Sequence, residues 1–141
     1  MKNPNDIRTL ADWRYEEAEN LSKIGYHDGA FYLAGYAIEL CLKAKICETL
    51  GVTDFYSFHV PRSDLSKTFL IHNLGRLVLL SGLYPKFEAQ KANDLIFKGH
   101  WDRVNSWTEK SRYDDKGSHD ATETNLFLES VKIIITWIKM N

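Results

Sequence analysis

The sequence predicts an all-α protein, an up-and-down bundle of about five helices that forms a single domain over residues 1–141. Three observations support this fold class. Apolar residues recur at helical spacings of three and four in most segments, and no segment alternates as a strand does. Glycine and proline fall between these segments, and a content of 44% hydrophobic and 26% charged residues is typical of a soluble globular protein.

The N-terminal third predicts two long helices. Residues 6–24 have apolar side chains on one face, and Gly25 ends this first helix. A second helix follows from His27 to Leu50, with Gly51 as its C-terminal cap. The first half of this second helix is apolar nearly all round, which predicts that it packs against neighbours on several sides.

The middle of the chain is less regular. Residues 52–66 contain Pro61 and several aromatic residues without a sustained period, so we expect a long loop. Its aromatic side chains would pack on their own bundle or contact another subunit. Residues 67–82 then predict a third helix, and Pro85 opens a fourth in "PKFEAQKANDLIF".

The C-terminal part predicts a short helical piece and one long helix. After Gly99, "HWDRVNSW" places Trp101 and Trp107 at a spacing that favours burial, and "SRYDDKGSH" is a polar loop. Asp120 and Glu123 resemble a capping box at the start of the last helix. That helix has the clearest pattern of the chain, with Ala121, Thr124, Leu128, Val131, Ile135 and Ile138 on one face.

Composition excludes several classes of function. A net charge of −1 provides no overall attraction to nucleic acid or to an acidic membrane. No apolar run approaches the roughly 20 residues of a membrane span, and the N-terminus lacks a signal-peptide core, so we expect a cytoplasmic protein. Cys41 and Cys47 would lie roughly 9 Å apart in one helix, too far for a disulfide. Without metal-ligand spacing or a glycine-rich phosphate loop, we expect neither a metal nor a cofactor.

The second helix carries a polar stripe within its apolar surroundings. Tyr32, Tyr36, Glu39 and Lys43 fall within about 60° of one another around the helix axis. An exposed Glu39–Lys43 pair would contribute little to stability. However, the stripe continues into apolar residues, and a carboxylate at partial burial needs a partner. We therefore expect either a structural ion pair or a functional polar cluster, with candidate members Glu39, Lys43, His72, Arg112 and Tyr113.

His72 has two interpretations. It could cap the third helix, or it could join the polar cluster. His59 and His100 are interpreted as loop residues.

Four segments together resemble the HEPN family of higher eukaryotes and prokaryotes. They are "FYLAGYAIELCLKA", "HNLGRL", "WTEKSRY" and the apolar final helix, and the likeness extends from about Leu21 to Trp137. The resemblance implies a four- or five-helix bundle that commonly dimerises. It also implies links to nucleotides or RNA, to toxin–antitoxin pairs or to defence, often with a small nucleotidyltransferase as the protein partner.

The resemblance also implies a ribonuclease site to look for. Active members are metal-independent ribonucleases that use an arginine and a histidine separated by four to six residues, and Arg112 and His119 have six residues between them. The arginine would bind the phosphate, and the histidine would transfer a proton. The intervening residues depart from the family pattern, because Asp114 and Asp115 oppose an incoming phosphate and Gly117 disfavours a continuous helix.

Two leading functions follow from this sequence, and the balanced charge also leaves open a third, an interaction module without any link to nucleotides. The first is a cytoplasmic, dimeric HEPN-like binding or regulatory module without an intact catalytic motif, in which Arg112 is the buried partner of Glu39. The alternative is a metal-independent endoribonuclease with Arg112 and His119 exposed in one cleft near a dimer interface. The position of Arg112 distinguishes them, since it points inward in the first case and outward in the second.

Overall fold

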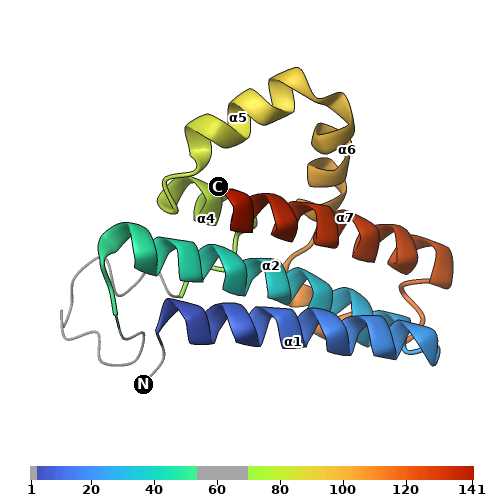
Figure 1. The fold of residues 1–141 in the computed structure, drawn as a ribbon. Helices are drawn as coiled ribbons and strands as arrows, with labels where there is room; N and C mark the ends of the chain where they lie inside the picture. Colours follow the sequence, from blue (N-terminus) through green and yellow to red (C-terminus); the bar gives the residue numbers. More distant parts are fainter. Residues whose placement is uncertain (1–2, 54–69) are drawn as a thin grey trace.

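The structure is a computed structural model, and it describes residues 3–53 and 70–141 (Figure 1). Within these ranges the chain forms six α-helices and one short 3₁₀ helix, without a strand. The helices are α1 (Pro4–Lys23), α2 (His27–Leu50), α4 (Leu74–Leu80), α5 (Tyr84–Asn93), α6 (Leu95–Val104) and α7 (Ala121–Met140), and the 3₁₀ helix η1 spans Glu109–Tyr113. The predicted all-α fold class is confirmed. The predicted aromatic loop of residues 52–66 lies almost wholly outside the described residues.

Helices α1, α2 and α7 are the long elements of the bundle, and α2 is the central one (Figure 1). Helix α2 contacts α1 most extensively, and it also contacts α7, α4 and η1. Because neighbours cover it on several sides, most side chains from Ala30 to Cys47 are buried. The apolar first half of this helix correctly predicted this position.

Capping residues define the ends of the long helices. The Asn3 side chain accepts a hydrogen bond from the Asp6 amide, and Asp6 accepts one from the Asn3 amide, which completes a capping box on α1. Gly51 ends α2 in the left-handed conformation, with φ of 68°, as predicted. Asp120 caps α7 by accepting a hydrogen bond from the Glu123 amide at 2.7 Å.

The region of α4 to α6 differs from its predicted boundaries. Helix α4 begins only at Leu74, because the Asn73 side chain caps it by accepting from the Arg76 amide at 2.9 Å. The fourth predicted helix is broken at Asp94, whose backbone is extended and whose side chain caps α6. Helix α6 then passes through Gly99, so the prediction of a new helix after that glycine is wrong.

Aromatic side chains fill the space that α5, α6 and α7 enclose. The Phe87 ring meets Trp101 edge-on at 4.6 Å between centroids and Trp137 at 5.5 Å. Trp101 and Trp107 are both buried, which confirms their predicted place in the core. Cys41 and Cys47 are free and buried, as expected from their spacing.

Trp107 packs directly against the backbone of α2. A Cβ atom placed on Gly35 would lie 2.3 Å from ring atoms of Trp107, far inside van der Waals contact. The absence of a side chain at Gly35 therefore brings the segment that precedes η1 close to the polar stripe of α2. None of the described helices is long and apolar enough to cross a membrane.

Candidate functional site

A buried ionic cluster lies at the centre of α2. Glu39 is 1% exposed and Lys43 is 5% exposed, although both are charged residues. Lys43 Nζ lies 2.6 Å from Glu39 Oε1, one helical turn away. His72 Nδ1, from the segment before α4, lies 2.6 Å from the same oxygen. The carboxylate therefore has two nitrogen partners, which is what its burial requires.

The two interpretations of His72 are resolved by this geometry. Asn73, and not His72, caps α4, and His72 joins the Glu39–Lys43 pair. Its side chain stays 42% exposed, while Glu39 behind it is buried. Because Nδ1 faces the carboxylate, the other ring nitrogen, Nε2, is left on the outer side of the ring.

A surface pocket of about 420 Å³ adjoins this cluster. We call it the His72 pocket, and its lining consists of residues 70–74, Arg76, Asn105 and residues 107–110. Two cationic side chains, Arg76 and Lys110, line it, together with one carboxylate, Glu109. A volume of this size falls in the range that holds small molecules.

Arg112 lies on η1 and not in the buried cluster. Its side chain is exposed, so the prediction that it points inward to pair with Glu39 is wrong. The guanidinium contacts Tyr32 and Tyr113, and hydrogen bonding to these two side chains raises the pKa of Arg112 above its usual value. Tyr113 is 75% exposed and lies outside the cluster as well. The physical reason is that His72, which the sequence places far from α2, already occupies the place beside Glu39.

Both ring nitrogens of His119 contact carboxylate oxygens. Its Nε2 lies 3.0 Å from Asp114 Oδ2, and its Nδ1 lies 3.2 Å from Glu123 Oε1. The ring stacks on Phe31 at 3.9 Å between centroids. Burial lowers the pKa of His119, but the hydrogen bonds to Asp114 and Glu123 outweigh it, so that the pKa is raised overall. Both nitrogens donate in this arrangement, which is the protonated imidazolium form.

Asp28 holds the loop that carries His119 against α2. Its carboxylate accepts hydrogen bonds from the Gly117 amide at 2.7 Å and from the His119 amide at 3.0 Å. The Gly117 amide is the main reason that the pKa of Asp28 is lowered. Sequence reasoning missed this residue, because its partners lie about 90 positions further along the chain and only the acidic first turn of α2 hinted at a role.

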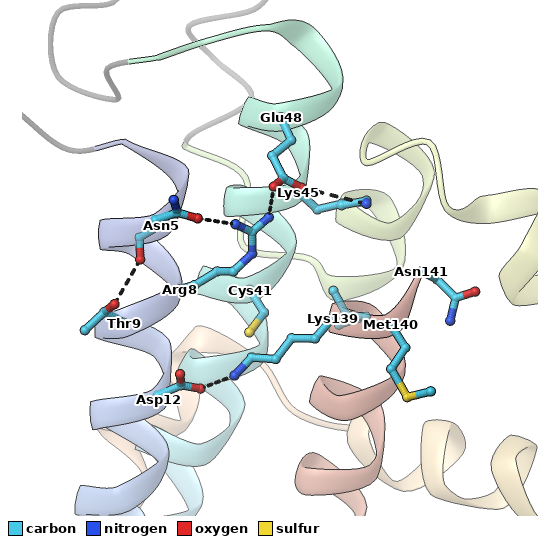
Figure 2. Close-up of a pocket in the computed structure, with 11 residues that line it drawn as sticks. Asn5, Arg8, Thr9, Asp12, Cys41, Lys45, Glu48, Lys139, Met140 and Asn141 are labelled. Carbon is cyan, nitrogen blue, oxygen red and sulfur yellow. Dashed lines mark hydrogen bonds and ion pairs between the residues drawn. The ribbon is translucent and has the colours of Figure 1, made fainter.

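A second pocket, of about 610 Å³, lies where α1, α2 and the end of α7 meet (Figure 2). Its cationic side chains face carboxylates across the pocket. Arg8 and Lys45 pair with Glu48, and Lys139 Nζ lies 2.5 Å from Asp12 Oδ1. Each of the three cations of this pocket therefore already has a carboxylate partner, and the pocket offers little to a charged ligand.

One further histidine differs from its prediction. His100 lies within α6 and not in a loop, and its Nδ1 lies 2.9 Å from Ser130 Oγ on α7. Arg103 donates to the same hydroxyl at 3.0 Å. Ser130 is fully buried, so this trio joins α6 to α7 and presents no accessible nucleophile.

His59 lies outside the described residues. No group of three or more His, Cys, Asp or Glu side chains suited to a metal ion occurs in residues 3–53 and 70–141.

The fold places this chain in the class of small helical-bundle domains. Its central helix carries a buried cluster of acidic and basic side chains. The HEPN domain family matches residues 5–141, nearly the whole chain, so the chain belongs to this family. Neither a curated protein nor a solved structure matches the chain at a significant level.

Proposed function

We propose that this HEPN domain is a binding or regulatory module without ribonuclease activity. One observation carries the proposal, namely that both ring nitrogens of His119 are committed to carboxylates. An imidazolium cannot accept a proton from a 2′-hydroxyl, and both of its N–H groups are already used. In addition, Asp114 and Glu123 bring negative charge to the place where a scissile phosphate would have to bind.

The contacts of Arg112 support the same conclusion. Its guanidinium is engaged by Tyr32 and Tyr113, and no hydrogen bond, ion pair or ring contact joins it to His119 in the part of the chain that the structure describes. A ribonuclease of this kind needs the two side chains at one phosphate.

The alternative function, a metal-independent endoribonuclease, is favoured by one observation. Arg112 is exposed, as an enzyme that binds RNA through this residue requires. The 10% exposure of the His119 side chain opposes it, because the proton-transfer group is largely covered.

An RNA-cleavage assay tests the proposal. Purified wild-type protein, Arg112→Ala and His119→Ala are incubated with mixed-sequence single-stranded RNA under metal-free conditions. We expect no cleavage above the protein-free control from any of the three. Cleavage by the wild type that both variants lose would overturn the proposal and establish the endoribonuclease.

For its partners, the family membership supports a role beside a nucleotidyltransferase-type protein or in a toxin–antitoxin type pair in the cytoplasm. A homodimer is part of the same proposal. Exposed apolar side chains at both ends of α5 are the surface that we assign to this pairing, and they are Leu79, Leu80, Tyr84, Leu95 and Ile96.

A further inference from the structure

We propose that the His72 pocket binds the phosphate group of a small phosphorylated molecule. The inference adds a ligand class to the binding function proposed above and rests on it. Its evidence is separate from the Arg112–His119 region, since it depends on the side chains that line this pocket.

The cationic side chains of the His72 pocket have no anionic partner among the described residues. Arg76 and Lys110 line the pocket from α4 and η1, and both side chains are exposed. Neither side chain makes an ion pair or a hydrogen bond with the residues that the structure describes. The pocket of Figure 2 is different, because Arg8 and Lys139 are each paired with a carboxylate there. In contrast to the cations of the pocket in Figure 2, those of the His72 pocket are thus available to an anionic ligand.

The ring of His72 is held in one orientation by the buried ionic cluster. Its Nδ1 is held by Glu39 at 2.6 Å, and Lys43 contacts the same carboxylate oxygen. The buried pair fixes the ring, so that Nε2 lies on the outer side of the ring in a side chain that lines the pocket. Nε2 has no partner among residues 3–53 and 70–141. A bound phosphate would supply one, and it would favour the form in which Nε2–H donates.

The charge and the size of the His72 pocket also suit a small anionic ligand. Arg76 and Lys110 face one carboxylate of the lining, Glu109, so these three side chains together carry a positive charge. The side chains of Asn73 and Asn105 add neutral hydrogen-bonding groups for the rest of a ligand. A volume of about 420 Å³ suits a small molecule. A nucleic-acid strand would need a continuous basic track, and the net charge of −1 argues against one.

Trp107 provides a specific reporter for this pocket. It is one of the lining residues, and its buried Nε1–H has no hydrogen-bond partner among the residues that the structure describes. In an amide and indole NMR titration, glucose 6-phosphate and inorganic phosphate should each shift the Trp107 indole signal saturably. The Trp13 indole, which is exposed on α1, should not move. Glucose at the same concentration is the matched control without phosphate, and chloride keeps the ionic strength constant.

Charge-removing variants complete the test. Arg76→Gln combined with Lys110→Gln should weaken glucose 6-phosphate binding at least about 10-fold, because two charge-assisted hydrogen bonds are lost. Lys132→Gln removes an exposed cation of α7 and should leave the affinity unchanged. Circular dichroism confirms that each variant is folded.

The outcomes separate this inference from the proposed function. The absence of a saturable shift up to about 10 mM phosphate would overturn the inference, as would equal weakening by Lys132→Gln. Binding of a short single-stranded RNA at this pocket without binding of glucose 6-phosphate would also overturn it. RNA cleavage by the wild type would instead refute the binding-module function, while phosphate binding at this pocket would remain measurable.

Discussion

At the scale of single residues, the Glu39–Lys43 pair is a charge interaction almost completely removed from water. Attraction between such charges is offset by the cost of their desolvation, so the pair adds little net stability. Removing one partner is different, because the other charge stays buried with less compensation. The glutamate contacts two nitrogens, Lys43 Nζ and His72 Nδ1, so its loss affects both of them.

We expect Glu39→Gln to lower the free energy of unfolding by about 3 kcal/mol or more, because the buried ammonium group loses its carboxylate. Urea unfolding at neutral pH measures this change. The double variant Glu39→Leu with Lys43→Met removes both charges and keeps similar volumes, and it should cost less than Glu39→Gln alone. If the free energy of unfolding of Glu39→Gln lies within about 1 kcal/mol of the wild-type value, the burial of these charges has little energetic consequence, and the prediction is wrong.

His119 gives the chain a stability that depends on pH. Its folded pKa is raised above the ordinary value of 6.5, chiefly by Asp114 once the opposing effect of burial is overcome. The contribution of His119 is therefore fully present below about pH 6.5 and is lost as the pH rises through the folded pKa. The loss in unfolding free energy on His119→Ala should thus be larger at about pH 6 than at about pH 9.

Chemical denaturation of the wild type and His119→Ala at several pH values between about 6 and 9 makes this comparison. Phe31→Leu is a suitable control, because it removes the stacked ring and leaves the ion pairs in place. The loss in unfolding free energy on Phe31→Leu should vary less with pH than the loss on His119→Ala. A His119→Ala effect that is constant or grows toward alkaline pH would contradict the imidazolium assigned to this residue.

At the scale of elements, the contact between Gly35 and Trp107 fixes the approach of η1 to α2. An alanine normally stabilises a helix interior by roughly 0.5–1 kcal/mol relative to glycine. At Gly35 the new methyl group would overlap the Trp107 indole, which is buried and cannot yield without moving its segment. We expect Gly35→Ala to destabilise the protein by about 1–3 kcal/mol.

Gly99→Ala is the matched control for this change. Gly99 lies within α6, and an added Cβ there meets no other atom within 4 Å. This variant should be neutral or more stable by up to about 1 kcal/mol. Thermal unfolding of the two variants beside the wild type measures the contrast. Equal shifts in the same direction would refute the close packing of Trp107 on α2.

The ends of a helix could be predicted from the sequence where residues within or next to that helix determine them. The bounds of α2 and the cap of α7 follow from local signals, namely Gly51 and Asp120. The break at Asp94 was missed, because the apolar spacing of the flanking residues continues across it and only the capping side chain reveals it. The contact between His72 and Glu39 was anticipated only as one of two interpretations, since a contact across 33 positions depends on the tertiary fold.

At the scale of the whole molecule, the site could be predicted less well than the bundle. Glu39 and Lys43 are visible from the sequence because they interrupt an apolar helix. The predicted position of Arg112 was wrong, because an arginine followed by an aromatic residue is equally compatible with a buried site and with an exposed site. Arg76 and Lys110 escaped notice, since their relevance arises only from the pocket that α4 and η1 form together.

The oligomeric state is a property of the whole molecule, and its charge and surface bear on it. A net charge of −1 creates little repulsion between two copies. Leu95 and Ile96 are 78% and 77% exposed where α5 meets α6, and covering each would contribute about 1.5–3 kcal/mol to association. Sedimentation equilibrium should therefore give about twice the 16.3 kDa of one chain.

The same pairing predicts that the midpoint of thermal unfolding rises with protein concentration, because dissociation accompanies unfolding. Ile96→Glu should yield a monomer, since a carboxylate at this position would have to be desolvated in the interface. Ile24→Glu is the control, because Ile24 is 68% exposed at the end of α1, away from α5, and its replacement should leave the dimer intact. A monomeric wild type would refute the homodimer, and dissociation by Ile24→Glu alone would place the interface on the α1–α2 side of the bundle.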